Sequence, residues 1–234
     1  MEELLSKDID GLIIEPSKTQ ISCRHTSLYD QMDEYGIPYV FIQGYFEQMK
    51  KKPYVLMDDM KGGYLITKYL IELGHKNIHG IFKADDVQGQ ARHKGYVRAL
   101  QEAGMLYDPD SVTWFYTEDR EVKPRETISG AIQAETPMDA VVCYNDQVAV
   151  EVIRTLREFG KKVPRDVSVT GFDNSLLAKN NHIPITTISH PQDKLGSMAA
   201  ELLLRLILGE ELTEQELHIR VEPEIVVRDS TWKR

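Results

Sequence analysis

Several things that the sequence lacks narrow the kinds of protein it can be. The chain of 234 residues contains only two cysteines, Cys23 and Cys143, which lie far apart, so a disulfide framework is not expected. No apolar run approaches the roughly 20 residues that a membrane-spanning helix needs. The first ten residues, MEELLSKDID, are acidic and lack the basic and apolar regions of a signal peptide. These absences predict a soluble, cytoplasmic protein.

Clustered positive charge is also missing. The chain has 37 acidic and 28 basic residues, a net charge of -9, without long runs of one sign. One short basic run, residues 50–52, is typical of a solvated loop. Because neutralising phosphates requires clustered Lys and Arg, this chain itself is not expected to bind nucleic acid or an anionic membrane.

Motifs of enzymes are scarce as well. The sequence has no G-x-G-x-x-G, P-loop, G-x-S-x-G or H-E-x-x-H motif. Asp58–Asp59 and Asp85–Asp86 are adjacent carboxylates, but neighbours in a strand point to opposite faces, so helix capping by Asp59 is favoured over a metal site. His75 follows a helix-ending glycine and is expected to have a capping or surface role. The sequence therefore predicts no catalytic residue, no metal and no cofactor.

What is present is a nearly regular alternation of strand and helix patterns, clearest over residues 139–174. The apolar run 140–144 has the length and β-branched content of a strand buried on both faces, and it stops at Asn145. A helix pattern follows, with apolar residues at 149, 152, 153 and 156. A second strand, 167–170, runs into Gly171–Asn174. The unit is β-α-β, and a right-handed crossover makes its two strands parallel.

The same alternation continues along the chain and predicts an α/β fold with parallel sheets. Residues 1–10 resemble the last turns of a helix. Further strands are expected at 12–14, 38–42, 54–57, 78–82 and 112–116, and a final edge strand at 219–227. Helices are expected at 27–35, 64–73, 92–103, 125–134 and 193–208, with a polar loop at 83–90.

Polar side chains gather where the predicted strands end, at the edge of the sheet where open α/β folds bind ligands. The candidate ligand-binding residues are Glu15, Gln43, Lys83, Asp85, Arg92, Asn145, Asp173 and His190. Carboxylates, amides and a guanidinium together can satisfy sugar hydroxyls, which both donate and accept hydrogen bonds. The alternative stays open that Asn145 is only a helix cap and Asp173 only a turn former.

Short motifs also occur along the chain in a characteristic order. They are IDGLI at 9–13, GG at 62–63, LGH at 73–75, Arg92 three residues before Gly95, CYND at 143–146, VPRDVSV at 163–169, GFDN at 171–174 and TTI at 186–188. Their order and spacing resemble the effector-binding core of the lactose/galactose repressor (LacI/GalR) family over nearly the whole chain. Within that family, residues 80–86 and 189–191 look most like the arabinose-responsive repressors of bacilli, which join this core to a winged-helix domain of the GntR type.

The resemblance implies a periplasmic-binding-protein-like type I fold, in which two parallel-sheet lobes are joined by three chain crossings and hold a sugar between them. Arg92, Asn145 and Asp173 match the sugar-contacting residues of the family, and Gln43 and His190 fall near pocket-lining positions. The crossings are expected near Met57–Asp58, Ser189–Pro191 and Leu217–His218. The N-terminal lobe would then contain 1–57 plus 191–216, and the C-terminal lobe 58–190 plus 217–234. The first lobe would lack its initial β-α-β unit, which leaves a sheet edge open.

The function that the resemblance implies is that of a sugar-sensing effector domain of a bacterial transcriptional regulator. L-arabinose is the expected effector, a homodimer is the expected assembly, and DNA would be reached only through a domain that this chain does not contain. Two alternatives stay open. A sugar-binding protein of a transport system would share the fold, and an α/β enzyme acting on a sugar is less favoured because no acid/base pair has the required neighbours.

Overall fold

The computed structural model describes residues 9–234, and contacts between residues divide the chain into two compact units. Unit 1 contains the chain up to Met57, Asp85–Val87 and Pro191–Glu222, and unit 2 contains Asp58–Ala84, Gln88–His190 and Pro223–Arg234. The helix end expected over residues 1–10 falls largely outside the described residues.

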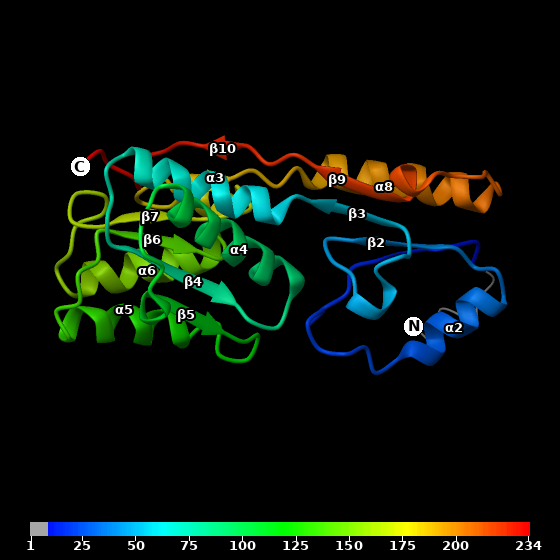
Figure 1. Ribbon diagram of the computed structural model, residues 1–234, viewed down its shortest axis with the longest axis horizontal. Helices are drawn as coiled ribbons and strands as arrows, with labels where there is room; N and C mark the ends of the chain where they lie inside the picture. Colours follow the sequence, from blue (N-terminus) through cyan, green and yellow to red (C-terminus); the bar gives the residue numbers. More distant parts are fainter. Residues whose placement is uncertain (1–8) are drawn as a thin grey trace. The chain divides into compact units, whose positions relative to one another are not determined.

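Unit 1 is built on a four-stranded parallel sheet in the order β1-β2-β3-β9 (Figure 1). The strands are β1 (Leu12–Ile14), β2 (Tyr39–Ile42), β3 (Tyr54–Met57) and β9 (His218–Val221). A short 3₁₀ helix, η1 (Glu47–Met49), connects β2 to β3. Strand β1 pairs only with β2 among the described strands, so it forms an edge of this sheet.

Two helices cover this sheet, and each buries every second side chain of its strands. Tyr39 and Phe41 of β2 belong to one core cluster with Tyr29 of α2 (Thr26–Glu34). Val40 belongs to another cluster with Leu195 of α8 (Gln192–Ile207). Because successive strand residues point to opposite faces, α2 and α8 cover opposite faces of the sheet. Each large apolar side chain buried in this way contributes about 1.5–3 kcal/mol. The short helix α9 (Glu214–Leu217) leads into β9.

Unit 2 is built on a second four-stranded parallel sheet, in the order β5-β4-β6-β7. Its strands are β4 (Ile78–Lys83), β5 (Val112–Phe115), β6 (Ala140–Cys143) and β7 (Ser168–Thr170). A 3₁₀ helix, η2 (Pro109–Ser111), precedes β5. The chain passes from β4 outward to β5 and then back across to β6, so the direction of winding reverses between β4 and β6. The carboxyl edge at such a reversal is the usual ligand site of an open α/β sheet.

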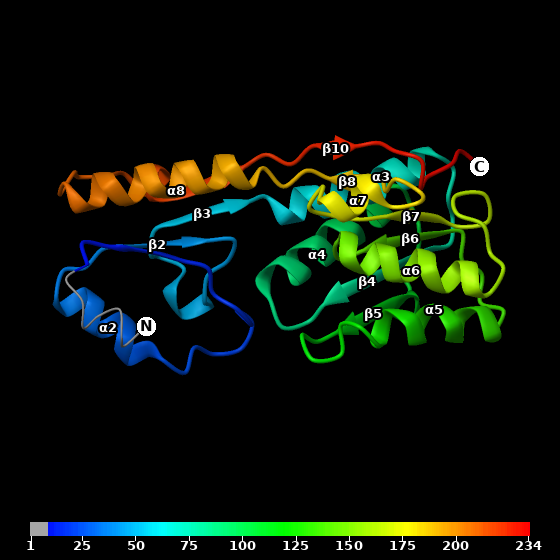
Figure 2. The same ribbon diagram turned by 180° about the vertical axis from the view of Figure 1, so that it is seen from behind.

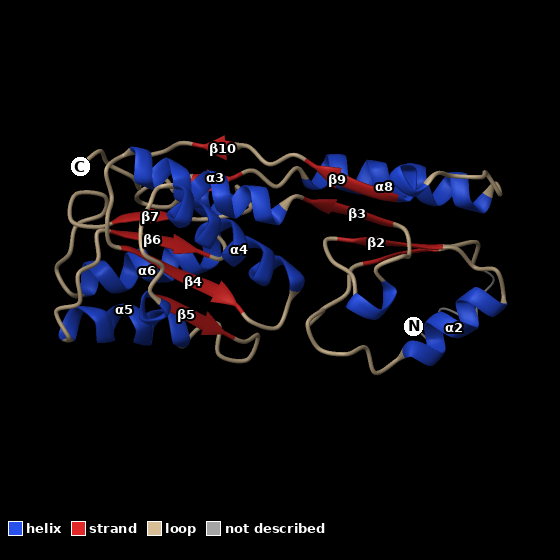
Figure 3. Cartoon of the chain, in the orientation of Figure 1, coloured by secondary structure: helices blue, strands red, loops and turns tan. Residues whose placement is uncertain are grey.

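Helices cover both faces of this second sheet. Helices α3 (Asp59–Glu72) and α4 (Val87–Glu102) lie in front of it in Figure 1, whereas α5 (Lys123–Gln133) and α6 (Asp146–Glu158) lie in front in Figure 2. The five-residue helix α7 (Leu176–Asn180) packs beside α6. The predicted alternation and the α/β fold are confirmed (Figure 3).

The C-terminal segment departs from the expected pattern. Residues 219–227 do not form one edge strand, because β9 pairs with β3 in unit 1 whereas β10 (Ile225–Val226) pairs antiparallel with β8 (Thr187–Ile188) in unit 2. Pro223 lies between them and cannot donate to a ladder. The expected crossing at Leu217–His218 is therefore wrong, and the chain leaves unit 1 at Glu222.

Helix α4 begins earlier than its sequence pattern indicates. The polar stretch 83–90 was expected to be a loop, but β4 extends to Lys83 and α4 starts at Val87. The hydroxyl oxygen of Thr19 accepts a hydrogen bond from the Val87 N–H at 2.9 Å. This partner lies 68 positions away, so no local signal marks the helix start. Within residues 9–234, no helix is long and apolar enough to cross a membrane.

Candidate ligand-binding site

Arg92 is the centre of a buried polar cluster at the carboxyl edge of the unit 2 sheet. It lies on α4 and is 4% exposed. Its Nε donates to Asp59 Oδ1 at 2.8 Å, and its Nη1 donates to the carbonyl oxygen of Tyr144 at 2.6 Å. Burial works against the charged guanidinium, but Asp59 and its other neighbours raise the pKa of Arg92 above its ordinary value. Arg92 is therefore a fixed cation.

Two aromatic rings hold the guanidinium plane. Its central carbon lies 3.6 Å from the ring centroid of Phe172 and 4.6 Å from that of Tyr144. A cation over an aromatic face is favourable by about 2 kcal/mol where water is excluded. The Arg92 side chain thus has its orientation set both by hydrogen bonds and by stacking.

Two glycines bring the helices that carry Arg92 and Asp59 together. A Cβ on Gly63 of α3 would collide with the carbonyl oxygen of Arg92, and a Cβ on Gly95 of α4 would collide with that of Met60. Only glycine permits two helix backbones to approach this closely. Gly63 of the GG motif and Gly95 are therefore needed to place the first turn of α3 beside Arg92.

Asp173 faces Arg92 from the turn after β7, where its backbone has an unusual conformation. Its φ is 98° and that of Asn174 is 50°, both in the region that favours glycine. Backbone pairing supports the turn, because the Asp173 N–H donates to the Ile188 carbonyl at 2.9 Å and Asp173 bridges to Ser189. This pairing also places His190, the next residue, beside Asp173.

Side chains around this turn stabilise it through hydrogen bonds. Buried Asp146 accepts hydrogen bonds from the Ser175 N–H at 2.7 Å, the Ser175 hydroxyl at 2.8 Å and the Thr187 hydroxyl at 2.7 Å. Burial raises the pKa of Asp146, while these hydrogen bonds oppose the rise. Arg228 donates from Nη2 to Asn174 Oδ1 and from Nη1 to the Ile185 carbonyl. The turn that presents Asp173 is thus fixed on both sides.

The spacing within the cluster leaves hydrogen-bonding capacity for a ligand. Asp173 Oδ1 lies 3.7 Å from Arg92 Nη2 and 3.7 Å from His190 Nδ1, beyond hydrogen-bonding distance in both cases. The Asp173 side chain is 30% exposed. His190 Nε2 is buried and has no hydrogen-bond partner among the described residues. Asp173 can therefore accept from a ligand hydroxyl while Arg92 and His190 donate to one.

Asn145 and Lys83 line a neighbouring hollow of about 190 Å³ at the same sheet edge. Asn145 Oδ1 accepts from the Val148 N–H at 3.0 Å, so the residue does cap α6, as the simpler alternative expected. The hollow is also lined by Thr117, Arg120 and Gln147, which carried no sequence signal. With the hydroxyl of Tyr144, six of its lining residues thus offer polar groups.

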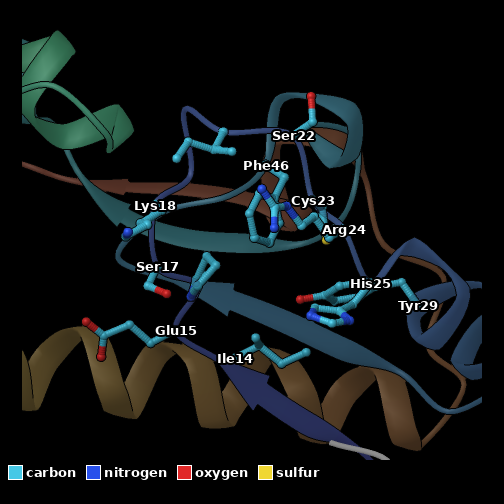
Figure 4. Close-up of a pocket in the computed structure, with 12 residues that line it drawn as sticks. Ile14, Glu15, Ser17, Lys18, Ser22, Cys23, Arg24, His25, Tyr29 and Phe46 are labelled. Atoms are coloured by element: carbon cyan, nitrogen blue, oxygen red, sulfur yellow. The ribbon is translucent and has the colours of Figure 1, made fainter. Parts of the chain in front are cut away.

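The remaining candidates lie in unit 1. Glu15 borders a hollow of about 490 Å³ together with Ser17, Lys18, Arg24 and His25 (Figure 4). Gln43 has a φ of 70°, and its N–H donates to the Val55 carbonyl at 3.3 Å. Asp85 is buried, and its carbonyl accepts from the Gln20 N–H at 3.3 Å.

Two sequence-based assignments are wrong. Asp58, not Asp59, caps α3 by accepting from the Lys61 N–H at 2.9 Å, and Asp59 is the buried partner of Arg92. The surface role expected for His75 is wrong, because the residue is 2% exposed and its Nε2 lies 3.1 Å from the Trp232 carbonyl oxygen. The capping role expected for it as the alternative is confirmed, since its backbone N–H donates to the Leu70 carbonyl at the end of α3 at 3.2 Å. Within residues 9–234, no group of three or more His, Cys, Asp or Glu side chains is placed to hold a metal.

The fold and this cluster define a class, the α/β ligand-binding domains that resemble periplasmic binding proteins. A sequence family described as periplasmic binding protein-like domain matches residues 67–231. The chain belongs to this family, as an effector-binding domain of the LacI type. The predicted family resemblance is confirmed.

Curated regulators are similar over nearly the whole chain. The arabinose metabolism transcriptional repressor of Halalkalibacterium halodurans is 39% identical over 236 residues, which cover 99% of this chain and 62% of that protein. The repressor of the same name from Geobacillus stearothermophilus is 36% identical over 233 residues, 99% of this chain and 64% of that protein. The chain therefore spans less than two thirds of the length of these relatives. They are transcriptional repressors and not enzymes.

A solved structure gives the same result for the fold. The transcriptional regulator CelR in complex with cellobiose is 31% identical to this chain, with a TM-score of 0.84 over 98% of this chain and 68% of that one.

Proposed function

We propose that this chain is the sugar-sensing effector domain of a cytoplasmic transcriptional regulator and that its effector is L-arabinose. The observation that carries the proposal is the position of Asp173 Oδ1, 3.7 Å from both Arg92 Nη2 and His190 Nδ1. These distances are longer than a direct hydrogen bond. A ligand hydroxyl placed between Asp173 and either Arg92 or His190 can accept a hydrogen bond from that side chain and donate one to the carboxylate.

A sugar fits this site better than an apolar effector does. Burying Arg92, Asp173 and His190 under an apolar group would leave polar atoms without partners, at a cost of about 1–3 kcal/mol each. The same cost gives selectivity, since an epimer whose hydroxyl points away from Asp173 leaves the carboxylate unsatisfied. The names of the two arabinose-metabolism repressors support a pentose among the possible sugars.

The proposed mechanism is a population shift. The sugar binds one conformation of the domain more tightly than another, and only this difference in affinity can change the affinity for DNA. DNA would be bound by a separate domain, and the regulator would act as a homodimer. That the sugar is held between two lobes, with Glu15, Gln43 and Asp85 among its contacts, stays a prediction.

Isothermal titration calorimetry with L-arabinose, D-galactose, D-xylose and D-ribose tests the proposal. We expect L-arabinose to bind with a dissociation constant at least tenfold below those of the other three sugars. Tighter binding of another sugar would replace L-arabinose as the effector. Binding of none of the four would overturn the ligand claim.

A further inference from the structure

Tyr144 lies between the Arg92 side chain and the neighbouring hollow of about 190 Å³. Its carbonyl oxygen accepts from Arg92 Nη1 at 2.6 Å, and its ring centroid lies 4.6 Å from the guanidinium carbon. Tyr144 also lines the hollow. Asp59, Phe172 and Asp173 lie against the Arg92 side chain as well, but none of these three lines the hollow. Tyr144 is therefore the wall that the two spaces share.

The two spaces are built from helices on opposite faces of the unit 2 sheet. Arg92 comes from α4, which lies in front of the sheet in Figure 1. Asn145, Gln147 and Val148 line the hollow at the start of α6, which lies in front in Figure 2. Tyr144 directly follows β6, at the carboxyl edge of the sheet. A ligand that reaches from Arg92 into the hollow must therefore pass the Tyr144 ring.

Contacts on two sides hold the Tyr144 ring in place. Phe115 of β5 packs edge-on against it, with ring centroids 5.6 Å apart and planes at 79°. This edge-to-face arrangement is a favoured geometry of aromatic pairs. Phe115 is itself 2% exposed and belongs to the core of unit 2. Displacing the ring would thus break its cation–π contact with Arg92 and its aromatic contact with Phe115 together.

The hollow has the chemistry of a sugar site but not the size of an independent one. Its volume of about 190 Å³ lies below the range of small-molecule pockets, about 300–1,000 Å³. Thr117, Arg120 and Gln147 line it with hydroxyl, guanidinium and amide groups, all of which pair with hydroxyls. The hollow thus fits an extension of the candidate sugar site that Tyr144 closes off.

We propose that Tyr144 determines the size of the effector, by admitting a monosaccharide beside Arg92 and excluding a second sugar ring from the hollow. The inference rests on the proposed function, and it concerns the length of the sugar and not which monosaccharide binds. In wild type, a disaccharide would have to displace the Tyr144 ring. With a small side chain at this position, the hollow is continuous with the Arg92 site, and its polar groups can pair with the hydroxyls of a second ring.

A different role for Tyr144 would be only to hold Arg92 in place. That role predicts that removing the ring weakens the binding of a monosaccharide and adds no new ligand. A limit on size predicts a new affinity for disaccharides. The carbonyl oxygen that accepts from Arg92 belongs to the main chain and remains in every variant at this position.

Calorimetry with L-arabinose and with three L-arabinose disaccharides that differ in linkage tests the proposal. Wild type should bind L-arabinose at least 100-fold more tightly than any of the disaccharides. Tyr144→Ala should bind at least one disaccharide at least tenfold more tightly than wild type does. Tyr144→Phe retains the ring and should discriminate as wild type does. Tyr116→Ala, which removes an exposed tyrosine of the same unit, is the matched control and should also behave as wild type.

Three results would overturn the proposal. The first is a wild-type protein that binds a disaccharide as tightly as L-arabinose, and the second is a Tyr144→Ala variant that gains no disaccharide. The third is an equal gain in Tyr144→Phe, which would assign the effect to the hydroxyl and not to the ring. Loss of L-arabinose binding without any gain, in a variant that melts as wild type does, would leave Tyr144 only the role of holding Arg92.

Folding and the proposed function are checked separately. If Tyr144→Ala does not fold, Tyr144→Val takes its place, since β-branched residues suit a strand end. If wild type binds another monosaccharide, the disaccharides of that sugar replace those of L-arabinose. Wild type that binds no sugar at all would overturn the proposed function instead, so the two failures are distinguishable.

Discussion

Arg92 and Asp59 form a buried ion pair between α4 and α3, with Nε and Oδ1 2.8 Å apart and only 5% and 11% of the two side chains exposed. Removing one partner of a buried pair leaves the other charge uncompensated, at a cost of about 3–5 kcal/mol. Asp59→Ala should therefore lower the free energy of unfolding by about 3 kcal/mol or more in urea denaturation. Asp58→Ala, which removes only a helix cap, should cost about 1 kcal/mol. Equal losses in the two variants would contradict the role given to Asp59.

Arg228 positions the turn that presents Asp173, through its hydrogen bond to Asn174 Oδ1. Arg228→Met should weaken sugar binding about tenfold, because Asn174 then loses a contact that supports its φ of 50°. Adding Asn174→Gly should restore most of the affinity, since glycine adopts a positive φ without strain. Calorimetry on the single and double variants measures both effects. A double variant no better than Arg228→Met would show that Arg228 does not act through this turn.

The crossing of α3 and α4 depends on glycine. Gly95→Ala should destabilise the protein by more than 2 kcal/mol, because its Cβ would collide with the Met60 backbone. Gly130 in α5 has no neighbouring atom within 4 Å of such a Cβ. Gly130→Ala should instead stabilise the protein by about 0.5–1 kcal/mol through helix propensity. Thermal unfolding of the two variants checks this contrast, and a shift of the same sign in both would refute it.

Asp139 makes the stability depend on acid pH. Burial works against its ionised form, but His75 Nδ1 at 3.3 Å and the N–H groups of Lys76 and Asn77 lower the pKa of this carboxyl from 3.8 to about 2. A carboxyl whose pKa is lower in the folded protein than in the unfolded chain contributes its full stabilisation of the fold when the pH is above the unfolded-state pKa. This contribution is lost as pH falls from about 4 to about 2. The stability difference between wild type and Asp139→Asn should shrink over that window, and a constant difference would contradict this account.

Local patterns were sufficient for most of the fold. The alternation of apolar strands and amphipathic helices is a short-range property, and it predicted the parallel sheets. The β9/β10 segment was different, because which sheet a short strand joins depends on pairing with residues far away, such as Tyr54 with His218. The prediction of where α4 starts failed for the same reason, because the Val87 N–H at its start donates to Thr19, which is distant in the sequence.

The candidate site was only partly visible in the sequence. Arg92, Asp173 and His190 could be predicted because each lies in a motif or at a strand end. Asp59, Tyr144 and Phe172 were missed as partners of Arg92, since stacking and ion pairing across helices leave no spacing pattern. The adjacency of Asp58 and Asp59 was a signal, but it does not show which of the two carboxylates pairs with Arg92.

The central claim is that Asp173, beside Arg92 and His190, binds the sugar. Calorimetric titration of L-arabinose into Asp173→Asn tests it most directly, with Asp229→Asn as a matched control in an exposed position of the same unit. We predict that Asp173→Asn loses at least 100-fold in affinity while its melting temperature without sugar stays within about 2 °C of wild type. Asp229→Asn should bind as wild type does. Wild-type affinity in Asp173→Asn would contradict the account.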